Sequence, residues 1–416
     1  MSDSITLTEG QQNAFEAFKK FILSPKDNVF VLEGYSGTGK TTLVRRILEF
    51  IPKLQKMYRT VAPHAKNDLN IVLTATTNKA AEALSQIVGE PVRTIHGAIG
   101  LRVHKDYKTG QTRLVPRQGA DPVSDSIVFV DEASYIDESL LKYILARCQN
   151  CKIVFIGDPA QLLNVGCQKS PVFNDRFPTA KLTEVVRQAE GNPIIAMATS
   201  FRNTVNTGNW ESLTVDGVHI KHLPRDEFED AIIQEFNDPT WTHNRSKVLA
   251  WTNRCVINFN HAIRKCVQGT PQIHVGDYVI CNRFISIKKC TLKTDQLCRV
   301  TGMGPLETRQ DVEGHKVQLD NRHVAFLPND PDQKEQAINK AQAEDNIAAL
   351  RTMDEWVDLR AAYACTINKS QGSTYDKVFI DLDDVARCRD GNQIARMLYV
   401  AVSRARETVY LTGDLV

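Results

Sequence analysis

The chain has 416 residues, of which 42% are apolar and 24% charged, and its formal net charge is +2. This length allows two to four domains with a large buried core, and the composition is ordinary for a soluble globular protein. The low net charge excludes attraction of a polyanion by the field of the whole chain, so such a partner would need local basic patches. No apolar run approaches the roughly 20 residues of a membrane span, and the first residues lack the basic and apolar regions of a signal peptide.

Ten cysteines are scattered through apparent strands and helices. Cys148 and Cys151 form one C-x-x-C pair, with no second pair at zinc-finger spacing and no histidine pair nearby in the sequence. We therefore expect buried, reduced thiols and neither a disulfide framework nor a metal site. Reduced thiols indicate a reducing compartment, so we expect an intracellular, cytoplasmic protein.

A phosphate-binding loop is predicted at 34–41, where the sequence Gly-Tyr-Ser-Gly-Thr-Gly-Lys-Thr fits G-x-x-x-x-G-K-[ST]. The apolar run 28–32 before it predicts a short buried strand, and 42–48 after it predicts a helix. This order aims backbone N–H groups and the positive end of a helix at an anion, and the glycines let the backbone close around phosphate oxygens. Lys40 would reach the β- and γ-phosphates and the Thr41 hydroxyl would hold Mg²⁺, so we expect a nucleoside triphosphate site.

Strand and helix signals alternate along the first part of the chain, as they do in a parallel α/β sheet. Short apolar runs typical of strands buried on both faces occur at 29–32, 70–75, 126–130 and 152–156, and helical spacing occurs at 79–88. The segment 101–115 predicts a β-hairpin with its turn near Thr109 and Gly110. Five basic residues against Asp106 give this region a local charge of five minus one, or +4: Arg102, Lys105, Lys108, Arg113 and Arg117.

A second α/β unit is predicted from about residue 191, with a strand at 247–251 and a helix at 258–266. The pattern then becomes β, which indicates a small β-barrel inserted into this unit, with strands at 274–282, 297–302, 315–319 and 323–327. A polar helix is expected at 333–350. The α/β pattern returns with strands at 361–367 and 377–382.

Two carboxylates, Asp131 and Glu132, follow the apolar strand 128–130. At the carboxyl end of a strand beside a phosphate-binding loop, Asp131 would hold Mg²⁺ and Glu132 would orient and deprotonate the attacking water. A second apolar strand is followed by a polar turn that contains Gln161. Its amide could contact a γ-phosphate or its water, and the alternative is an ordinary turn glutamine.

Arg187 and Arg404 are candidates for a guanidinium aimed at the γ-phosphate. Such a group stabilises the charge that develops during phosphoryl transfer and is worth about 10³–10⁵ in rate. The sequence alone does not place either arginine near Lys40, and a surface ion pair is the alternative for each.

These pieces, in this order, resemble superfamily 1 helicases of the B class, meaning the RecD-like group and within it the phage Dda-type helicases. The resemblance covers nearly the whole chain and rests on nine motifs. They are the Q motif at 7–11 and motifs I at 34–42, Ia at 74–81, Ib at 94–97, II at 131–134, III at 157–161, IV at 182–187, V at 366–372 and VI at 399–404. It implies that Gln11 reads the adenine of ATP. The nucleotide-binding residues that it implies are Gln11, Gly34, Gly37, Thr38, Gly39, Lys40, Thr41, Thr42 and Gly372.

Four positions depart from the family pattern. Thr76 stands where motif Ia usually has proline, and Asn78 stands where it often has histidine. Asn368 stands where motif V commonly has histidine, and Tyr35 occupies a position that is usually small or proline.

The resemblance implies two RecA-like P-loop domains with ATP and Mg²⁺ in the cleft between them. The first would span 1–190, with a pin or wedge insertion at 101–125. The second would comprise 191–270 and 362–416, with an SH3-like β-domain inserted at 271–361. The first half would supply Lys40, Thr41, Asp131, Glu132 and Gln161, and Arg187 and Arg404 would approach from the linker and the second half.

Single-stranded DNA would lie across both halves, with polar contacts that follow the backbone without reading its sequence. The candidate contacts are Thr77, Asn78, His96, Thr366 and Lys369. Trp251 is a candidate for stacking on a base, with core packing as the alternative. The basic hairpin would be the wedge that separates the strands, with Tyr107 at its tip, and a solvated surface hairpin is the alternative.

The function expected from this resemblance is an ATP-dependent DNA helicase that moves 5′ to 3′ on single-stranded DNA and unwinds forked duplex DNA. The direction and a bacterial or phage-infected host cell follow from the resemblance alone. We expect a monomer, with a single-strand-binding or replisome protein as a candidate partner. The alternatives are a DNA-stimulated ATPase that displaces bound proteins, an RNA helicase, and a switch GTPase, which is disfavoured because no N-K-x-D tetrapeptide occurs.

Overall fold

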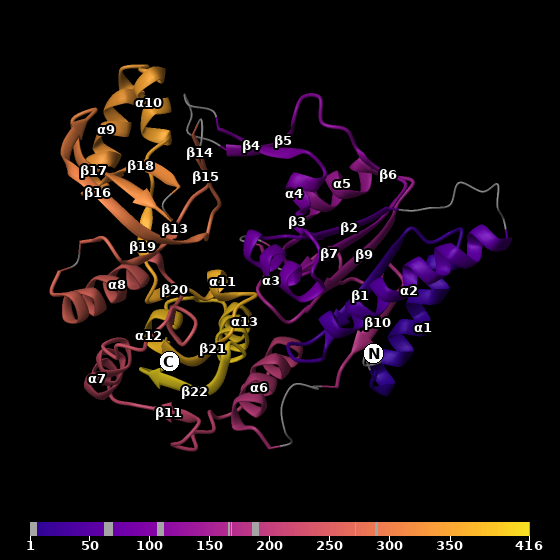
Figure 1. The fold of residues 1–416 in the computed structure, drawn as a ribbon. Coiled ribbons are helices and arrows are strands. Elements are labelled where there is room, and N and C mark those ends of the chain that lie inside the picture. Colours follow the sequence, from indigo (N-terminus) through magenta and orange to yellow (C-terminus); the bar gives the residue numbers. More distant parts are fainter. Residues whose placement is uncertain are drawn as a thin grey trace. The chain divides into compact units, whose positions relative to one another are not determined.

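The structure is a computed structural model that describes residues 6–61, 70–105, 112–164, 167, 169–184, 191–270, 272–287, 290–320 and 322–415 (Figure 1). The chain divides into two compact units. The first comprises 1–102, 114–192 and 205–207, and the second comprises 103–113, 193–204 and 208–416.

A six-stranded parallel sheet forms the centre of the first unit, in the order β10-β1-β9-β7-β2-β3. Its strands are β1 (Val29–Gly34), β2 (Asn70–Ala75), β3 (Arg93–Thr94), β7 (Ser126–Asp131), β9 (Lys152–Gly157) and β10 (Thr179–Leu182). The four strands expected in this region are confirmed. Because β1, β9 and β7 are neighbours and parallel, the residues that follow each of them meet at one edge of the sheet.

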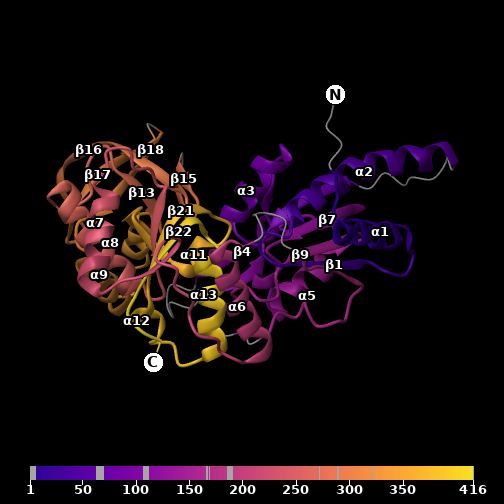
Figure 2. The same ribbon diagram turned by 90° about the horizontal axis from the view of Figure 1, so that it is seen from below.

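Helices cover both faces of this sheet, because alternate residues of the same apolar strand point to opposite faces. Phe30 and Leu32 of β1 pack with phenylalanines of α1 and with α2, whereas Val29 and Val31 pack on the side of α5. Figure 1 and Figure 2 show α1 and α2 side by side. The helices are α1 (Glu9–Leu23), α2 (Lys40–Val61), α3 (Asn78–Val88), α4 (Ile95–Ala98), the 3₁₀ helix η1 (Ala133–Tyr135) and α5 (Glu138–Arg147).

Two small two-stranded sheets are formed by segments between residues 101 and 149. The expected hairpin strands are present as β4 (Leu101–Lys105) and β5 (Thr112–Pro116), which pair with each other. The expected tip with Tyr107 lies outside the described residues. The other sheet pairs β6 (Val123–Ser124) with β8 (Cys148–Gln149).

The second unit contains a five-stranded parallel sheet in the order β11-β22-β21-β12-β20. Its strands are β11 (Ile220–His222), β12 (Ser246–Ala250), β20 (Ala364–Thr366), β21 (Tyr375–Asp381) and β22 (Ala405–Thr412). The helices are α6 (Pro193–Thr207), α7 (Arg225–Phe236), α8 (Asn253–Gln268), α11 (Ile367–Ser370), α12 (Leu382–Val385) and α13 (Gly391–Val402). The single strand expected at 361–367 is wrong, because β20 is shorter and Thr366 caps α11 by accepting a hydrogen bond from the N–H of Lys369.

An antiparallel sheet lies between these segments in the sequence, in the order β18-β17-β16-β13-β19, with its own apolar core. Its strands are β13 (Tyr278–Cys281), β16 (Leu297–Arg309), β17 (Val312–Leu319), β18 (His323–Pro328) and β19 (Leu359–Ala361), and β14 (Ile285–Ile287) pairs with β15 (Cys290–Leu292). The single helix expected at 333–350 is instead two, α9 (Pro331–Ala343) and α10 (Ile347–Asp354). The break occurs because Asp345 has a φ of +51° and the side chain of Asn346 caps α10.

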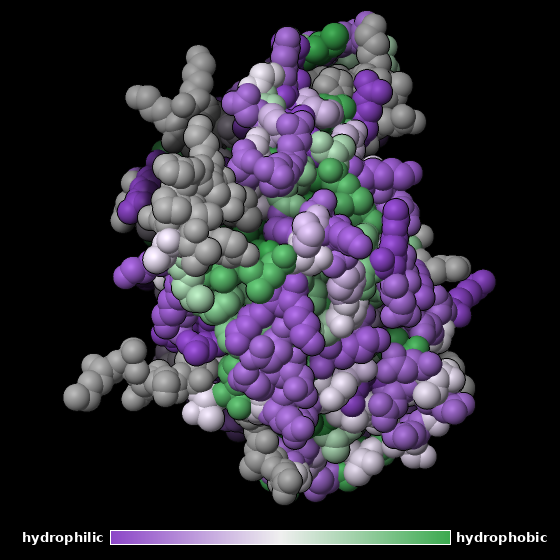
Figure 3. Space-filling view, turned by 90° about the vertical axis from the view of Figure 1, so that its right-hand side faces the viewer, coloured by the Kyte–Doolittle hydropathy of each residue, from purple (hydrophilic) through white to green (hydrophobic). Residues whose placement is uncertain are grey.

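The face drawn in Figure 3 is largely hydrophilic, with apolar residues in a few groups. Among the described helices, none combines the length and apolar character that a membrane span requires. Cys148 and Cys151 are buried free thiols, and burial raises the pKa of Cys148 to about 12 and also raises the pKa of Cys151. Within the described ranges, no group of three or more His, Cys, Asp or Glu residues is placed to hold a metal ion.

Candidate nucleotide site and nucleic-acid interface

The phosphate-binding loop joins the end of β1 to the first residue of α2, as the sequence predicts. Gly37 and Gly39 have φ values of +83° and +76°, which side chains rarely tolerate. The Lys40 ammonium donates hydrogen bonds to the carbonyl oxygens of Gly34 (2.5 Å) and Tyr35 (2.9 Å). The loop is therefore wrapped around the positive charge that would meet a triphosphate, and the helix N-terminus adds to that charge.

Gln11 ties the beginning of α1 to this loop. Its side chain is 3% exposed, and its amide nitrogen donates to the carbonyl oxygen of Thr38 at 3.2 Å. Its amide oxygen accepts from the N–H of Thr8 at 3.1 Å, and the Thr8 hydroxyl accepts from the N–H of Gln11, which completes a capping box. A Cβ on Gly39 would overlap the Gln11 amide nitrogen, so a side chain there would displace the Gln11 amide as well as strain the backbone. The contact of Gln11 with adenine stays a prediction.

The carboxylates of the candidate site follow β7. Asp131 is the last residue of that strand, and its Oδ1 accepts a hydrogen bond from the N–H of Glu132 at 2.9 Å. Glu132 has a φ of +53° and is the N-cap residue of η1. Behind it, a Cβ on Gly157 would lie 3.1 Å from the nitrogen of Ala133, so glycine is needed where β9 passes this turn.

Gln161 belongs to a tight turn after β9. The Asp158 carboxylate accepts from the N–H of Ala160 at 2.9 Å, and the N–H of Gln161 donates to the carbonyl oxygen of Asp158 at 3.2 Å. Asp158 and Gln161 are 0% and 4% exposed. The structure thus brings the residues after β1, β7 and β9 to one edge of the sheet, and these carry Lys40, Glu132 and Gln161.

Asp131 has the chemistry of a Mg²⁺ ligand. Burial raises the pKa of its carboxyl, and the N–H of Glu132 and the charge of Lys40 act in the opposite direction. A carboxylate whose desolvation is not fully compensated by hydrogen bonds and nearby charge is stabilised by a bound cation. The Thr41 hydroxyl offers a second oxygen ligand of the type that Mg²⁺ prefers. The oxygen set of Asp131 and Thr41 therefore fits this ion, which would supply positive charge beside a triphosphate.

We expect Asp131→Asn to raise the thermal stability of the nucleotide-free protein while it abolishes Mg²⁺-dependent hydrolysis. The folded-state pKa of Asp131 is raised, so ionisation costs stability above that pKa, and the cost vanishes as the pH falls toward the ordinary value of about 3.9. Thermal unfolding should show a midpoint about 1–3 °C higher for the variant at about pH 8, and no gain at about pH 4. Asp121→Asn, at an exposed position, is the control. A variant that is less stable at about pH 8 contradicts this account.

Of the two candidate arginines, the structure describes only Arg404. Arg187 lies outside the described residues. Arg404 is 5% exposed, and its guanidinium donates to the carbonyl oxygens of Val400 and Ser373 and to the hydroxyl of Ser403, at 3.1, 3.2 and 2.8 Å. Arg404 is therefore a fixed, buried cation of the second unit and is not the surface ion pair that was the alternative.

The candidate nucleic-acid contacts of the first unit follow two neighbouring strands, β2 and β3. The Thr77 hydroxyl caps α3 by accepting from the N–H of Ala80 at 3.1 Å, and Asn78 is the first residue of that helix. His96 lies in α4 after β3, and burial lowers the pKa of its imidazole while the charge of Asp137 raises it. The structure brings these three residues to one edge of the first sheet.

The candidates of the second unit have partners within the protein. The Lys369 ammonium lies 2.8 Å from the Asp295 carboxylate and donates to the side chain of Asn282 at 2.6 Å. Thr366 is 8% exposed and caps α11. A DNA phosphate at Lys369 would therefore have to compete with a carboxylate of the inserted segment.

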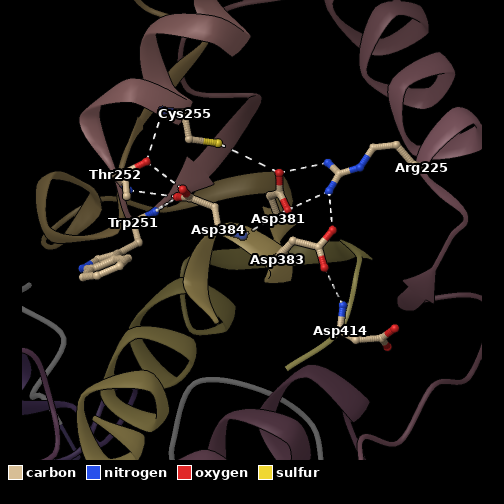
Figure 4. A network of polar contacts seen from close by, with 8 residues as sticks. All are labelled: Arg225, Trp251, Thr252, Cys255, Asp381, Asp383, Asp384 and Asp414. Carbon is tan, nitrogen blue, oxygen red and sulfur yellow. Dashed lines mark hydrogen bonds and ion pairs between the residues drawn. The ribbon is translucent and has the colours of Figure 1, made fainter. Parts of the chain in front are cut away.

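Trp251 follows β12 and is half-buried. Figure 4 shows its indole pointing away from a network of polar contacts that holds its backbone. Asp384 accepts from the N–H groups of Trp251 (2.8 Å) and Thr252 (2.9 Å) and from the Thr252 hydroxyl (2.6 Å), and Arg225 makes two hydrogen bonds to Asp381. The sequence gives no signal for Asp384, because its partners lie far away along the chain.

A phosphate-binding loop, a Mg²⁺-compatible aspartate and a following glutamate at one edge of a parallel sheet define a P-loop nucleoside triphosphatase. The family described as an AAA domain matches residues 6–214, and the UvrD-like helicase C-terminal domain matches 361–412. The chain therefore belongs to the AAA domain family and is a superfamily 1B helicase of the RecD-like, Dda type, an ATP-hydrolysing enzyme.

Individual relatives agree with this assignment. The ATP-dependent DNA helicase dda of Enterobacteria phage T4 is 26% identical over 97% of this chain and 98% of its own length. The RecBCD enzyme subunit RecD of Mycolicibacterium smegmatis is 23% identical over 92% of this chain and 68% of its own. The fold is similar to that of a Pif1 helicase from Bacteroides solved in complex with ADP-AlF3 and ssDNA, with a TM-score of 0.51, 17% identity, and coverage of 99% of this chain and 94% of that chain.

Proposed function

We propose that this protein moves along single-stranded DNA in the 5′ to 3′ direction and unwinds forked duplex DNA. Hydrolysis of ATP, with Mg²⁺ as the metal cofactor, would supply the free energy. The observation that carries the proposal is the meeting of Lys40, Asp131 and Glu132 at one sheet edge, beside the strand end that carries Thr77 and Asn78. The T4 relative is a DNA helicase, and the Bacteroides Pif1 structure holds ssDNA, which supports DNA as the polymer.

Arg404 of the second unit is proposed to stabilise the γ-phosphate during hydrolysis, and Arg187 is a second candidate. Gly372, with a φ of +75°, is proposed to let the backbone of motif V approach the nucleotide. Loss of the terminal phosphate would release these contacts and so drive movement on the strand. The enzyme is proposed to act as a monomer in the cytoplasm, where a single-strand-binding or replisome protein is a candidate partner.

Forked substrates test this proposal. A fork with a 5′ single-stranded tail should be unwound in the presence of ATP and Mg²⁺, and a fork with only a 3′ tail should not. Single-stranded DNA should stimulate ATP hydrolysis more than RNA of the same sequence. Removal of a tightly bound protein from DNA without unwinding would favour the displacing ATPase, and stronger stimulation by RNA would favour the RNA helicase.

The hairpin of β4 and β5 is proposed to be the wedge, because it carries the local excess of positive charge and lies between motifs Ib and II. Deleting 105–111 should reduce fork unwinding at least about tenfold, because separation costs about 1.4 kcal/mol per base-pair step and needs a rigid obstacle. DNA-stimulated ATPase should stay within about twofold. Replacing 106–111 by the same number of Gly and Ser residues separates the length of the hairpin from its side chains. Equal loss of ATPase and unwinding contradicts a wedge.

A further inference from the structure

Thr76 holds the backbone of both Asp131, the candidate metal ligand, and Glu132, the candidate catalytic base. It follows β2 directly beside the end of β7, and its side chain is 8% exposed. Its N–H donates to the carbonyl oxygen of Asp131 at 3.1 Å, and its hydroxyl donates to the carbonyl oxygen of Glu132 at 3.0 Å. The second bond reaches beyond the last pair of the β2–β7 ladder, so it depends on this side chain.

Glu132 needs such support, because its φ of +53° and ψ of 45° place it in the left-handed region. This conformation is unfavourable for a residue with a Cβ, and it persists only where the surrounding structure fixes it. Gly157 leaves room for the turn that follows, and the Thr76 hydroxyl fixes the carbonyl of Glu132 itself. The direction of the Glu132 carboxylate therefore depends on a hydrogen bond from motif Ia.

Thr76 also directly precedes two candidate nucleic-acid contacts in the chain, Thr77 and Asn78. Thr77 caps α3, and Asn78 is the first residue of that helix. A DNA strand bound at Thr77 and Asn78 would therefore shift a short, hydrogen-bonded segment that includes Thr76. We propose that Thr76 is a positioning residue that couples DNA at the beginning of α3 to the orientation of Glu132, and hence to ATP hydrolysis. This inference rests on the proposed function. The related helicases usually have proline here, which has no hydroxyl, so the link belongs to this chain's own sequence.

The test compares three variants. Thr76→Val keeps the shape of the side chain and removes the hydroxyl, and Thr76→Ser keeps the hydroxyl. Thr74→Val is the matched control, because the Thr74 hydroxyl makes an equivalent bond from β2 to β7, to the carbonyl oxygen of Phe129 at 2.6 Å, and is 0% exposed. Thr74→Val should cost stability as Thr76→Val does, without affecting Glu132.

We expect Thr76→Val to lower the kcat of DNA-stimulated ATP hydrolysis about tenfold, because a small misplacement of a catalytic group is costly. The KM for ATP and the affinity for single-stranded DNA should stay within about twofold, and Thr76→Ser and Thr74→Val should keep kcat within about twofold of the original protein. A normal kcat in Thr76→Val, an equal loss in Thr74→Val, or a change in KM alone would overturn the proposal. If the unmodified protein shows no stimulation by DNA, the proposed function fails instead.

Discussion

Lys40→Ala is expected to bind ATP poorly and to lose hydrolysis, whereas Glu132→Gln is expected to bind ATP and fail to hydrolyse it. The Lys40 ammonium donates hydrogen bonds to the carbonyl oxygens of Gly34 and Tyr35 at the N-terminus of α2. Loss of this side chain therefore removes the positive charge that the loop surrounds. Glu132→Gln keeps the size of the side chain and removes the base, which should lower kcat by about 10²–10⁴. A fluorescent ATP analogue measures the first effect, and single-turnover hydrolysis measures the second.

Lys53→Ala is the matched control, because Lys53 lies exposed in the same helix, α2. It should change neither binding nor hydrolysis. Thermal unfolding of each variant shows whether a loss comes from misfolding, since Lys40 also satisfies two carbonyl oxygens of the loop. Normal turnover in Lys40→Ala or Glu132→Gln would show that the triphosphate site has been assigned to the wrong residues.

The strand, loop and helix of the candidate phosphate site were predictable from the sequence, because the signal is local. The loop at 34–41 and the strand before Asp131 need only neighbouring residues to be recognised, and parallel pairing of β1, β9 and β7 then brings them together. Six strands of the two parallel sheets were predictable for the same reason, because each is a short apolar run: β1, β2, β7, β9, β12 and β21. The short strands β3, β10 and β11 are partly exposed and carry no such run.

Contacts between distant segments were not predictable. The hydroxyl of Thr76 reaches Glu132 only because β2 lies beside β7, and Asp384 reaches Thr252 only because β21 lies beside β12. Lys369 was predicted as a DNA contact from its motif alone, and nothing in the sequence indicated its ion pair with Asp295.

One missed boundary did have a local signal. Asn346, three residues before Ala349, is a helix N-cap of the usual kind, and it divides the expected helix at 333–350 into α9 and α10. The helical periodicity of 333–350 predicts one helix, but the cap at Asn346 begins a second helix within it.

Arg404→Lys is expected to lower kcat by about 10³ with little change in ATP affinity, because a guanidinium stabilises charge that appears only during transfer. Arg404 is buried, and acceptors on Val400, Ser373 and Ser403 hold the guanidinium plane in one orientation that an ammonium cannot reproduce. Arg406→Lys, two residues along the chain, is the control, since Arg406 is exposed and pairs with Asp376 at 3.1 Å. It should keep kcat within about twofold. Steady-state ATPase with saturating single-stranded DNA, read beside thermal unfolding, separates catalysis from folding. If Arg404→Lys loses stability yet keeps kcat, Arg404 stabilises the fold of the second unit and does not act in catalysis. Another cation, with Arg187 as the first candidate, must then contact the γ-phosphate.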